Sequence, residues 1–210
     1  MRVPVLFGLA ALGMATCQRV EEPAPTRPPE PALAAAPAAT TPPATESAPL
    51  TSPPEPVTCV VPLAEPPPPP AKPAASCPAD PVTAPPVLRM GRVAFPEATG
   101  SPSVEVEIAD TPATERRGLM YRTKLGAQKG MIFAWKSDSY RTFWMQNTCL
   151  PLDMLFIAKD GTIAGILEQV PVLNEEQRTV RCPVAYVLEV NAGWTRRHGV
   201  KPGMKADITL

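Results

Sequence analysis

The sequence has few of the residues on which common catalytic and metal sites depend. It contains one histidine, no Cys-x-x-Cys pair and no glycine-rich phosphate loop. A Ser-His or Cys-His nucleophile and the usual zinc sites are therefore poorly supported. His198 lies in a basic stretch next to glycine, for which we expect an exposed position; a catalytic role is the alternative. The formal net charge is zero, which gives no reason to expect a nucleic acid partner.

The apolar run at the N-terminus is too short to span a bilayer as a stable helix. Residues 1–16 begin with a charged Arg2 and continue with apolar residues, which is the pattern of a secretion signal. Cys17 ends the stretch MATC, where a bacterial lipoprotein signal places its lipidated cysteine. We therefore expect a periplasm-facing envelope protein with a lipid anchor at Cys17, the outer membrane being favoured by Gln18. The alternative is an ordinary cleaved signal with an incidental cysteine.

Aromatic residues are nearly absent from the first half of the chain, where proline is abundant. Ten of the eleven aromatic residues lie at Phe95 or later, while 23 of the 31 prolines lie between Pro23 and Pro86. A segment of this composition cannot offset its ordering entropy by burial. The sequence predicts a lipidated, disordered tether over 17–86 and one folded domain over 87–210. A proline-rich ligand for a partner domain is the alternative to a simple tether.

Five cysteines indicate an oxidising compartment. Without Cys17 four remain, and they allow three pairings. Cys149 and Cys182 both lie beside predicted strands, so we expect a disulfide between them. Cys59 with Cys77 would close a loop in the tether, and free buried thiols are the alternative.

Many short strands with few helices predict a mainly β fold, a compact sandwich or barrel with one or two short helices. Val104–Ile108 alternates apolar and acidic residues, as a half-buried strand does. Thr111 followed by proline predicts a short helix that ends near Gly118. Asp160-Gly161 between two apolar runs predicts a hairpin. Further strands are expected at 130–135, 141–145, 185–190 and 205–209, and a helical turn or two at 191–199.

Two acids lie inside apolar strands. Asp153 shares its strand face with Leu155 and Ile157, and Glu189 shares its face with Val187. An ionised carboxylate is costly to bury unless it is paired. The expected partners are Arg117, Arg122 and Arg141, with the Asn147 amide and the Thr148 hydroxyl as neutral donors. In a purely structural role, each acid would be held by an arginine or by backbone donors.

Four ordered motifs, ERRGLMYR, GMIFAW, FWMQNTCLPLDMLFI and YVLEVNAG, resemble the domain of unknown function 192 family over about residues 104–208. The resemblance implies a β-sandwich-like barrel with short helices, and it implies no agreed activity, cofactor or catalytic residue. The residues that match the family motifs are Gly118, Leu119, Met120, Arg122, Gly130, Met131, Trp144, Met145, Asn147, Thr148, Pro151, Asp153 and Glu189.

A binding or interaction module for a small polar ligand or an envelope component is the favoured function. Trp144 shares its predicted strand face with two polar residues, an arrangement that suits a sugar or another polar ligand, although a place in the core is an equal alternative. The candidate ligand-binding residues are Trp144, Asn147, Asp153, Glu189, Arg117 and Arg122. No catalytic residue, metal or cofactor is predicted, and the oligomeric state is left open.

Two alternative functions remain. Asp153 and Glu189 could act as acid and base in a hydrolase of an envelope polysaccharide, since two acids in unlike environments can have separated pKa values. Cu(I) binding is the second alternative, because thioethers suit this ion. Its candidate ligands are Met120, Met131, Met145 and Met154, for which core packing is the default.

Overall fold

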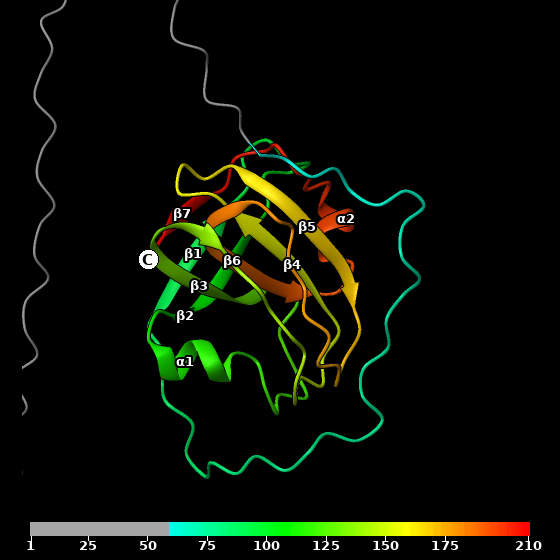
Figure 1. Cartoon of the computed structure of the whole chain (residues 1–210), viewed down its shortest axis with the longest axis vertical. Helices are drawn as coiled ribbons and strands as arrows, with labels where there is room; N and C mark the ends of the chain where they lie inside the picture. Colours follow the sequence, from blue (N-terminus) through cyan, green and yellow to red (C-terminus); the bar gives the residue numbers. More distant parts are fainter. Residues whose placement is uncertain (1–58) are drawn as a thin grey trace, which may run out of the picture. The chain divides into compact units, whose positions relative to one another are not determined.

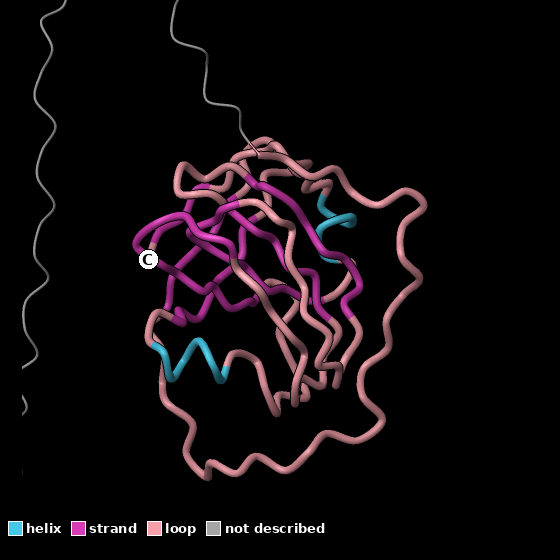
Figure 2. Tube along the Cα trace, viewed as in Figure 1, coloured by secondary structure: helices cyan, strands magenta, loops and turns pink. Residues whose placement is uncertain are grey.

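A computed structural model describes residues 59–210; the predicted signal, Cys17 and the tether up to residue 58 lie outside the described residues. The described chain forms seven strands and two short helices (Figures 1 and 2). In chain order they are β1 (Met90–Ala94), β2 (Ser103–Ala109), α1 (Pro112–Arg117), β3 (Lys129–Tyr140), β4 (Leu152–Ile157), β5 (Ile163–Val170), β6 (Pro183–Asn191), α2 (Trp194–His198) and β7 (Asp207–Thr209). The predicted mainly β fold with short helices is confirmed. Neither helix of this part is long and apolar enough to cross a membrane.

All seven strands belong to one sheet in the order β5-β4-β6-β3-β2-β1-β7. Neighbouring strands are antiparallel except for the parallel pair β2 and β3. The two ends of the sheet also meet. The amide of Ile163 donates to the carbonyl of Met204, and the amide of Ala206 donates to the carbonyl of Gly161, both at 2.9 Å. The sheet therefore curls into a barrel-like shape.

Local sequence signals account for the predicted helix and hairpin. Thr111 caps α1 with its side chain, Pro112 occupies the first helical position, and the helix ends at Gly118, whose φ is +48°. Gly161 turns the chain between β4 and β5 with a φ of +86°, a conformation that glycine adopts without steric cost. Both predictions are confirmed.

Two buried clusters lie on opposite faces of the sheet. The inner cluster draws apolar side chains from all seven strands and from α2, including Leu155, Leu188 and Trp194, so it fills the barrel. The outer cluster lies on the other face of β3, β4 and β6, and includes Phe133, Met154 and Val187. Loop residues cover this outer face. The division follows from side-chain alternation along the three strands.

Residues 59–86, here called the strap, run around the periphery of the domain without helix or strand (Figure 1). The amide of Val61 donates to the carbonyl of Ala164 at 2.7 Å, and the amide of Ala74 donates to the carbonyl of Cys149 at 2.9 Å. Leu63 packs against the inner cluster. The predicted boundary at residue 87 is therefore wrong, because the strap is bound to the domain.

Two disulfides fix the strap, and their pairing differs from the predicted one. Cys59 is bonded to Cys182, and Cys77 is bonded to Cys149. The predicted Cys149–Cys182 disulfide is wrong, as is a loop between the two strap cysteines. A proline-rich strap buries too little surface to hold itself in place, and a disulfide to each domain cysteine supplies the missing constraint.

One predicted strand is missing. Residues 141–145 make only an isolated bridge, between Phe143 and Arg178, and the chain there belongs to a loop between β3 and β4. β3 itself is longer than expected and continues to Tyr140 through an irregularity after Ala134. The extension ends in one aromatic residue, the exposed Tyr140.

Candidate functional site

The two buried acids lie on opposite faces of the sheet. In the register of β4 with β6, Asp153 is opposite Val190 and Met154 is opposite Glu189. Directly opposed residues share a face and successive residues alternate. Asp153 therefore points into the barrel with Val190, while Glu189 points to the outer face. The hypothesis that these two acids form one acid and base pair is wrong, because they cannot reach the same bond.

Asp153 is fully buried and saturated with hydrogen bonds. Its Oδ1 accepts from the backbone amides of Gln169 at 3.0 Å and Gly193 at 2.9 Å. Its Oδ2 accepts from the amide of Thr195 at 3.0 Å and from the hydroxyl of the same residue at 2.7 Å. Asp153 thus caps the N-terminus of α2 from β4. The predicted arginine partner is wrong; backbone donors and a hydroxyl take its place.

Glu189 is also buried, with 4% of its surface exposed. No hydrogen bond or ion pair to its carboxyl occurs within residues 59–210, so the predicted cation is wrong here too. Its cross-strand neighbours are apolar, Met131 on β3 and Met154 on β4. Burial raises the pKa of Glu189 to about 8. The carboxyl is therefore mostly protonated at neutral pH.

Glu189 lines a pocket of ≈ 440 Å³ on the outer face, here called the Glu189 pocket. Residues from α1, β3, β6 and the loop between β3 and β4 form its lining. They are Glu115, Arg116, Arg117, Gly118, Leu119, Phe133, Trp135, Tyr140, Arg141, Thr142, Phe143, Trp144, Thr148 and Glu189. A concave surface with aromatic walls and a few polar groups is the usual form of a small-molecule site.

The aromatic walls of this pocket are held by mutual contacts. Phe143 packs edge to face against Phe133, with 4.9 Å between ring centroids. The guanidinium of Arg141 lies 4.1 Å from the centroid of the Trp135 ring. Desolvation lowers the pKa of Arg141. Trp144 is 45% exposed, so it stands at the surface and not in the core.

The two other predicted arginines have acidic partners of their own. Arg117 pairs with Asp80 of the strap, and Arg122 pairs with Glu107 of β2. These hydrogen bonds lower the pKa of Asp80 and raise the pKa of Arg122. Arg117 still lines the Glu189 pocket, whereas Arg122 lines a neighbouring cavity of ≈ 380 Å³.

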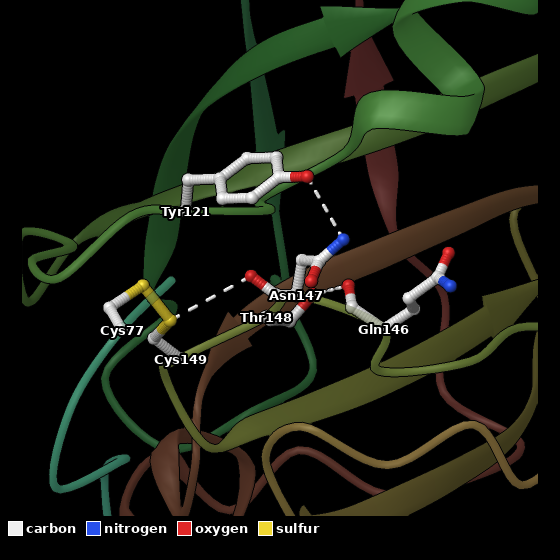
Figure 3. Close-up of a disulfide and its surroundings, with 6 residues drawn as sticks. All are labelled: Cys77, Tyr121, Gln146, Asn147, Thr148 and Cys149. Atoms are coloured by element: carbon white, nitrogen blue, oxygen red, sulfur yellow. Dashed lines mark hydrogen bonds between the residues drawn. A yellow bond between two sulfur atoms is a disulfide. The ribbon is translucent and has the colours of Figure 1, made fainter. Parts of the chain in front are cut away.

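Asn147 has a structural position beside the Cys77–Cys149 disulfide (Figure 3). Its backbone has a φ of +53°, which asparagine tolerates better than most residues. Its side-chain amide donates to the hydroxyl of Tyr121 at 2.9 Å, and the amide of Tyr121 donates to the carbonyl of Asn147 at 2.8 Å. These bonds connect the loop between α1 and β3 with the loop between β3 and β4, and both loops cover the outer face.

The candidate copper ligands divide between core and surface. Met131, Met145 and Met154 are buried in the outer cluster, where thioethers serve as packing. Met120 lines the neighbouring cavity instead. Within residues 59–210 no group of three or more His, Cys, Asp or Glu side chains is arranged to hold a metal ion.

His198 lies on the far side of the sheet from Glu189. Its ring stacks on Trp194 at 4.3 Å between centroids, and its Nδ1 is 2.8 Å from the Trp194 carbonyl. Trp194 belongs to the inner cluster. The histidine therefore contributes nothing to the Glu189 pocket.

The structure brings three of the six candidate ligand-binding residues to one pocket, namely Trp144, Glu189 and Arg117. Sequence reasoning missed Trp135 and Tyr140. Trp135 follows Phe133 at the strand period of two, which places both on one face, but only the β3–β6 register shows that Glu189 shares that face. No sequence signal marks Tyr140, because the irregularity in β3 places it.

Residues 95–208 match the model of a family described as "Uncharacterized ACR, COG1430". The chain belongs to this DUF192 family. A solved structure from Sinorhizobium meliloti 1021, described as a "putative transcription regulator", is 40% identical, with a TM-score of 0.56 over 60% of this chain and 98% of that one. A protein of unknown function from Novosphingobium aromaticivorans DSM 12444 is 35% identical, with a TM-score of 0.54 over 64% and 94%. A comparison with proteins of curated function found no match.

Proposed function

We propose that the domain is a binding module for a small polar ligand, and that the ligand enters the Glu189 pocket. The observation that supports it is the largely buried carboxyl group of Glu189, which lines a pocket of ≈ 440 Å³ and has no hydrogen-bond partner among residues 59–210. A ligand that hydrogen-bonds this carboxyl would add a bond that no residue of 59–210 supplies, with a net gain of about 0.5–1.5 kcal/mol.

The walls of the pocket support a ligand with both polar groups and a flat or apolar face. Trp144 and Tyr140 are 45% and 69% exposed, a high exposure for aromatic side chains at a pocket. Tyrosine and tryptophan combine a large contact area with a polar end, so they suit sugars and related molecules. Trp135 and Arg141 stack before any ligand arrives, which lowers the ordering cost of binding.

The three tryptophans permit a direct test with the oxidised full-length chain. Trp135 and Trp144 line the Glu189 pocket, and Trp194 is buried in the inner cluster on the opposite face. We would record the three indole N–H signals by NMR while adding hexoses, hexosamines, uronic acids and amino acids at millimolar concentration. We expect at least one class to shift Trp135 and Trp144 but not Trp194. If no class shifts the first two, or if all three move alike, the proposed function is wrong.

We also propose that the protein acts outside the cytoplasm on a lipid anchor at Cys17. Two disulfides support an oxidising compartment. The MATC stretch supports lipidation. Cells that express the chain would be labelled with a radioactive fatty acid, and we expect label in the wild type and none in Cys17→Ala. Equal labelling of the two would contradict the anchor.

A further inference from the structure

The geometry points to a ligand that carries a carboxylate, which the Glu189 pocket holds through the carboxyl group of Glu189 and the guanidinium of Arg141. This inference rests on the proposed binding function and deepens it by assigning the charge of the ligand. The carboxylate could belong to an acidic sugar or to another small organic acid, and the shared chemistry is an oxyanion on a compact polar body.

The first support is the balance of charges on the pocket lining. Besides Glu189, the lining contains three arginines, Arg116, Arg117 and Arg141, and one acidic side chain, Glu115. Asp80 of the strap offsets Arg117 from outside the lining. Glu189 itself is mostly neutral near pH 7 because burial raises its pKa to about 8. The lining therefore keeps an excess of positive charge, which attracts an anion and repels a cation.

The second support is an excess of hydrogen-bond donors. Arg141 has five N–H groups, and the structure accounts for two, from Nε to the carbonyl of Val184 at 3.5 Å and from Nη2 to the carbonyl of Ser137 at 3.1 Å. These bonds and the Trp135 ring fix the guanidinium plane. The protonated carboxyl of Glu189 adds an O–H donor. A carboxylate accepts several hydrogen bonds and donates none, so it complements this set.

An ammonium ligand is the competing class, since it could ionise Glu189 and pair with it. Such a ligand would be repelled by Arg116 and Arg141 of the pocket lining. Its ion pair with Glu189 would also require the desolvation of two charges, the ammonium and the carboxylate. A neutral hydroxyl-rich ligand would satisfy Glu189 but would leave the arginine donors without an anion. The three classes therefore differ in expected affinity although all could contact the same aromatic walls.

The test uses three monosaccharides that share one ring and differ in charge: D-glucuronate, D-glucose and D-glucosamine. The oxidised full-length chain would be titrated with each at about pH 6.5, where Glu189 is mostly protonated, and binding would be followed by the indole signals of Trp135 and Trp144. We expect glucuronate to bind at least about tenfold more tightly than glucosamine, with glucose between them. Equal affinities, or tighter binding of glucose or glucosamine, would overturn the inference and leave the binding function standing.

The pH dependence separates the role of Glu189 from that of the arginines. With a pKa of about 8, about one tenth of Glu189 is protonated at about pH 9, so the affinity for glucuronate should fall about tenfold from its value at about pH 6.5. Glu189→Gln keeps a neutral donor and acceptor, so its affinity should lose this dependence. If the wild type and Glu189→Gln respond to pH alike, the inference is wrong.

Other groups at the pocket that change charge need matched controls. Glu115 from α1 and Tyr140 from β3 line the same pocket, and the strands on either side of Glu189 present Met131 and Met154. Glu115→Gln and Tyr140→Phe should retain the tenfold loss between about pH 6.5 and pH 9. If either control removes the loss, Glu189 is not the group that responds to pH, and the inference fails.

Arg141 gives a readout that does not depend on Glu189. Arg141→Gln should reduce the preference for glucuronate over glucose about tenfold, because the remaining side chain has no positive charge. Arg92 of β1 is exposed and lies outside the pocket lining, so it serves as the matched control, and Arg92→Gln should change this preference by about twofold or less. An unchanged preference in Arg141→Gln, in a protein whose Trp194 signal shows the native fold, would overturn the inference.

Discussion

Asp153 and Glu189 are both buried in central strands, one register step apart, yet their surroundings differ in every respect. Asp153 points into the barrel and accepts four hydrogen bonds from the chain around α2. Glu189 points to the outer face, between two methionines, and accepts none from residues 59–210. A buried carboxylate that accepts four hydrogen bonds stabilises the folded protein, whereas a buried carboxyl without a partner destabilises it. This difference is the reason why we propose the outer face as the binding side.

Replacing Asp153 should have the largest effect. Asp153→Ala leaves three backbone amides and the Thr195 hydroxyl without an acceptor, and we expect it to lower the free energy of unfolding by about 4–5 kcal/mol. Urea unfolding measures this loss. Asp110→Ala is the control, because that acid forms an exposed pair with Arg89 and its loss should cost about 1 kcal/mol or less. Similar losses in the two variants would contradict the structural role of Asp153.

Removal of a strap disulfide should come next. The Cys77→Ala, Cys149→Ala double variant opens a cross-link across 72 residues, for which chain entropy predicts a loss of about 4 kcal/mol. Urea unfolding of the oxidised proteins measures it, and peptide mapping under non-reducing conditions checks the pairing. A peptide that joins Cys149 to Cys182 would contradict the structure. A loss below about 1 kcal/mol would mean that the strap stays in place without its disulfide.

Glu189→Gln should act in the opposite direction and stabilise the protein. The pKa of Glu189 rises from 4.5 to about 8 on folding, so the folded state holds a proton that the unfolded state releases. The free energy of unfolding therefore falls as pH rises between these two values. At about pH 7 the glutamine variant should be more stable by about 3 kcal/mol, and at about pH 4 the two should be equal. A difference that does not change with pH would contradict the burial of an unpaired carboxyl.

Trp144→Ala should have the smallest effect on stability. The side chain is 45% exposed, and the free energy of unfolding should change by about 0.5 kcal/mol or less. Its effect should appear in binding, because the ring forms part of the pocket rim. Thermal unfolding and the indole titration described above measure the two properties separately. A large loss of stability would place Trp144 in the core and weaken its role in the pocket.

Strand alternation correctly predicted which residues share a strand face with each of the two acids, but it did not predict their hydrogen-bond partners. Alternation along β4 and β6 correctly placed Asp153 with Leu155 and Glu189 with Val187. It could not show that the two acids lie on opposite faces, because the faces of two strands are related only by their pairing. The donors of Asp153 come from residues at least 16 positions away, on β5 and around α2.

Charge pairing was the wrong rule for choosing the partners of these acids. Arg117 and Arg122 are paired, but with Asp80 and Glu107, which are the acids near them at the surface. Long cations keep their charged groups near water, where pairing costs little desolvation. A carboxylate inside a barrel is reached more easily by backbone amides, which are already there and need not be desolvated as ions.

The disulfides show a second limit of prediction from the sequence, which concerns the use of composition to predict disorder. Cys59 and Cys77 lie in a segment whose composition predicts disorder, and composition describes what a segment can bury without help. A covalent bond removes that requirement, because it supplies the constraint that burial does not. The two strap cysteines were the sequence signal that this segment is bonded to the domain.

The disulfide between Cys59 and Cys182 also decides how the domain would carry mechanical load. A force that pulls on the chain before Cys59 passes through the cross-link directly to the start of β6. Everything between these two cysteines, including the strap and strands β1 to β5, forms a closed loop that bears no tension. The Cys77–Cys149 disulfide lies within this loop. Tension towards the C-terminus can therefore extend only the chain from Cys182 to Leu210, so β6 and β7 bear the load while the chain of β1 to β5 is not stretched.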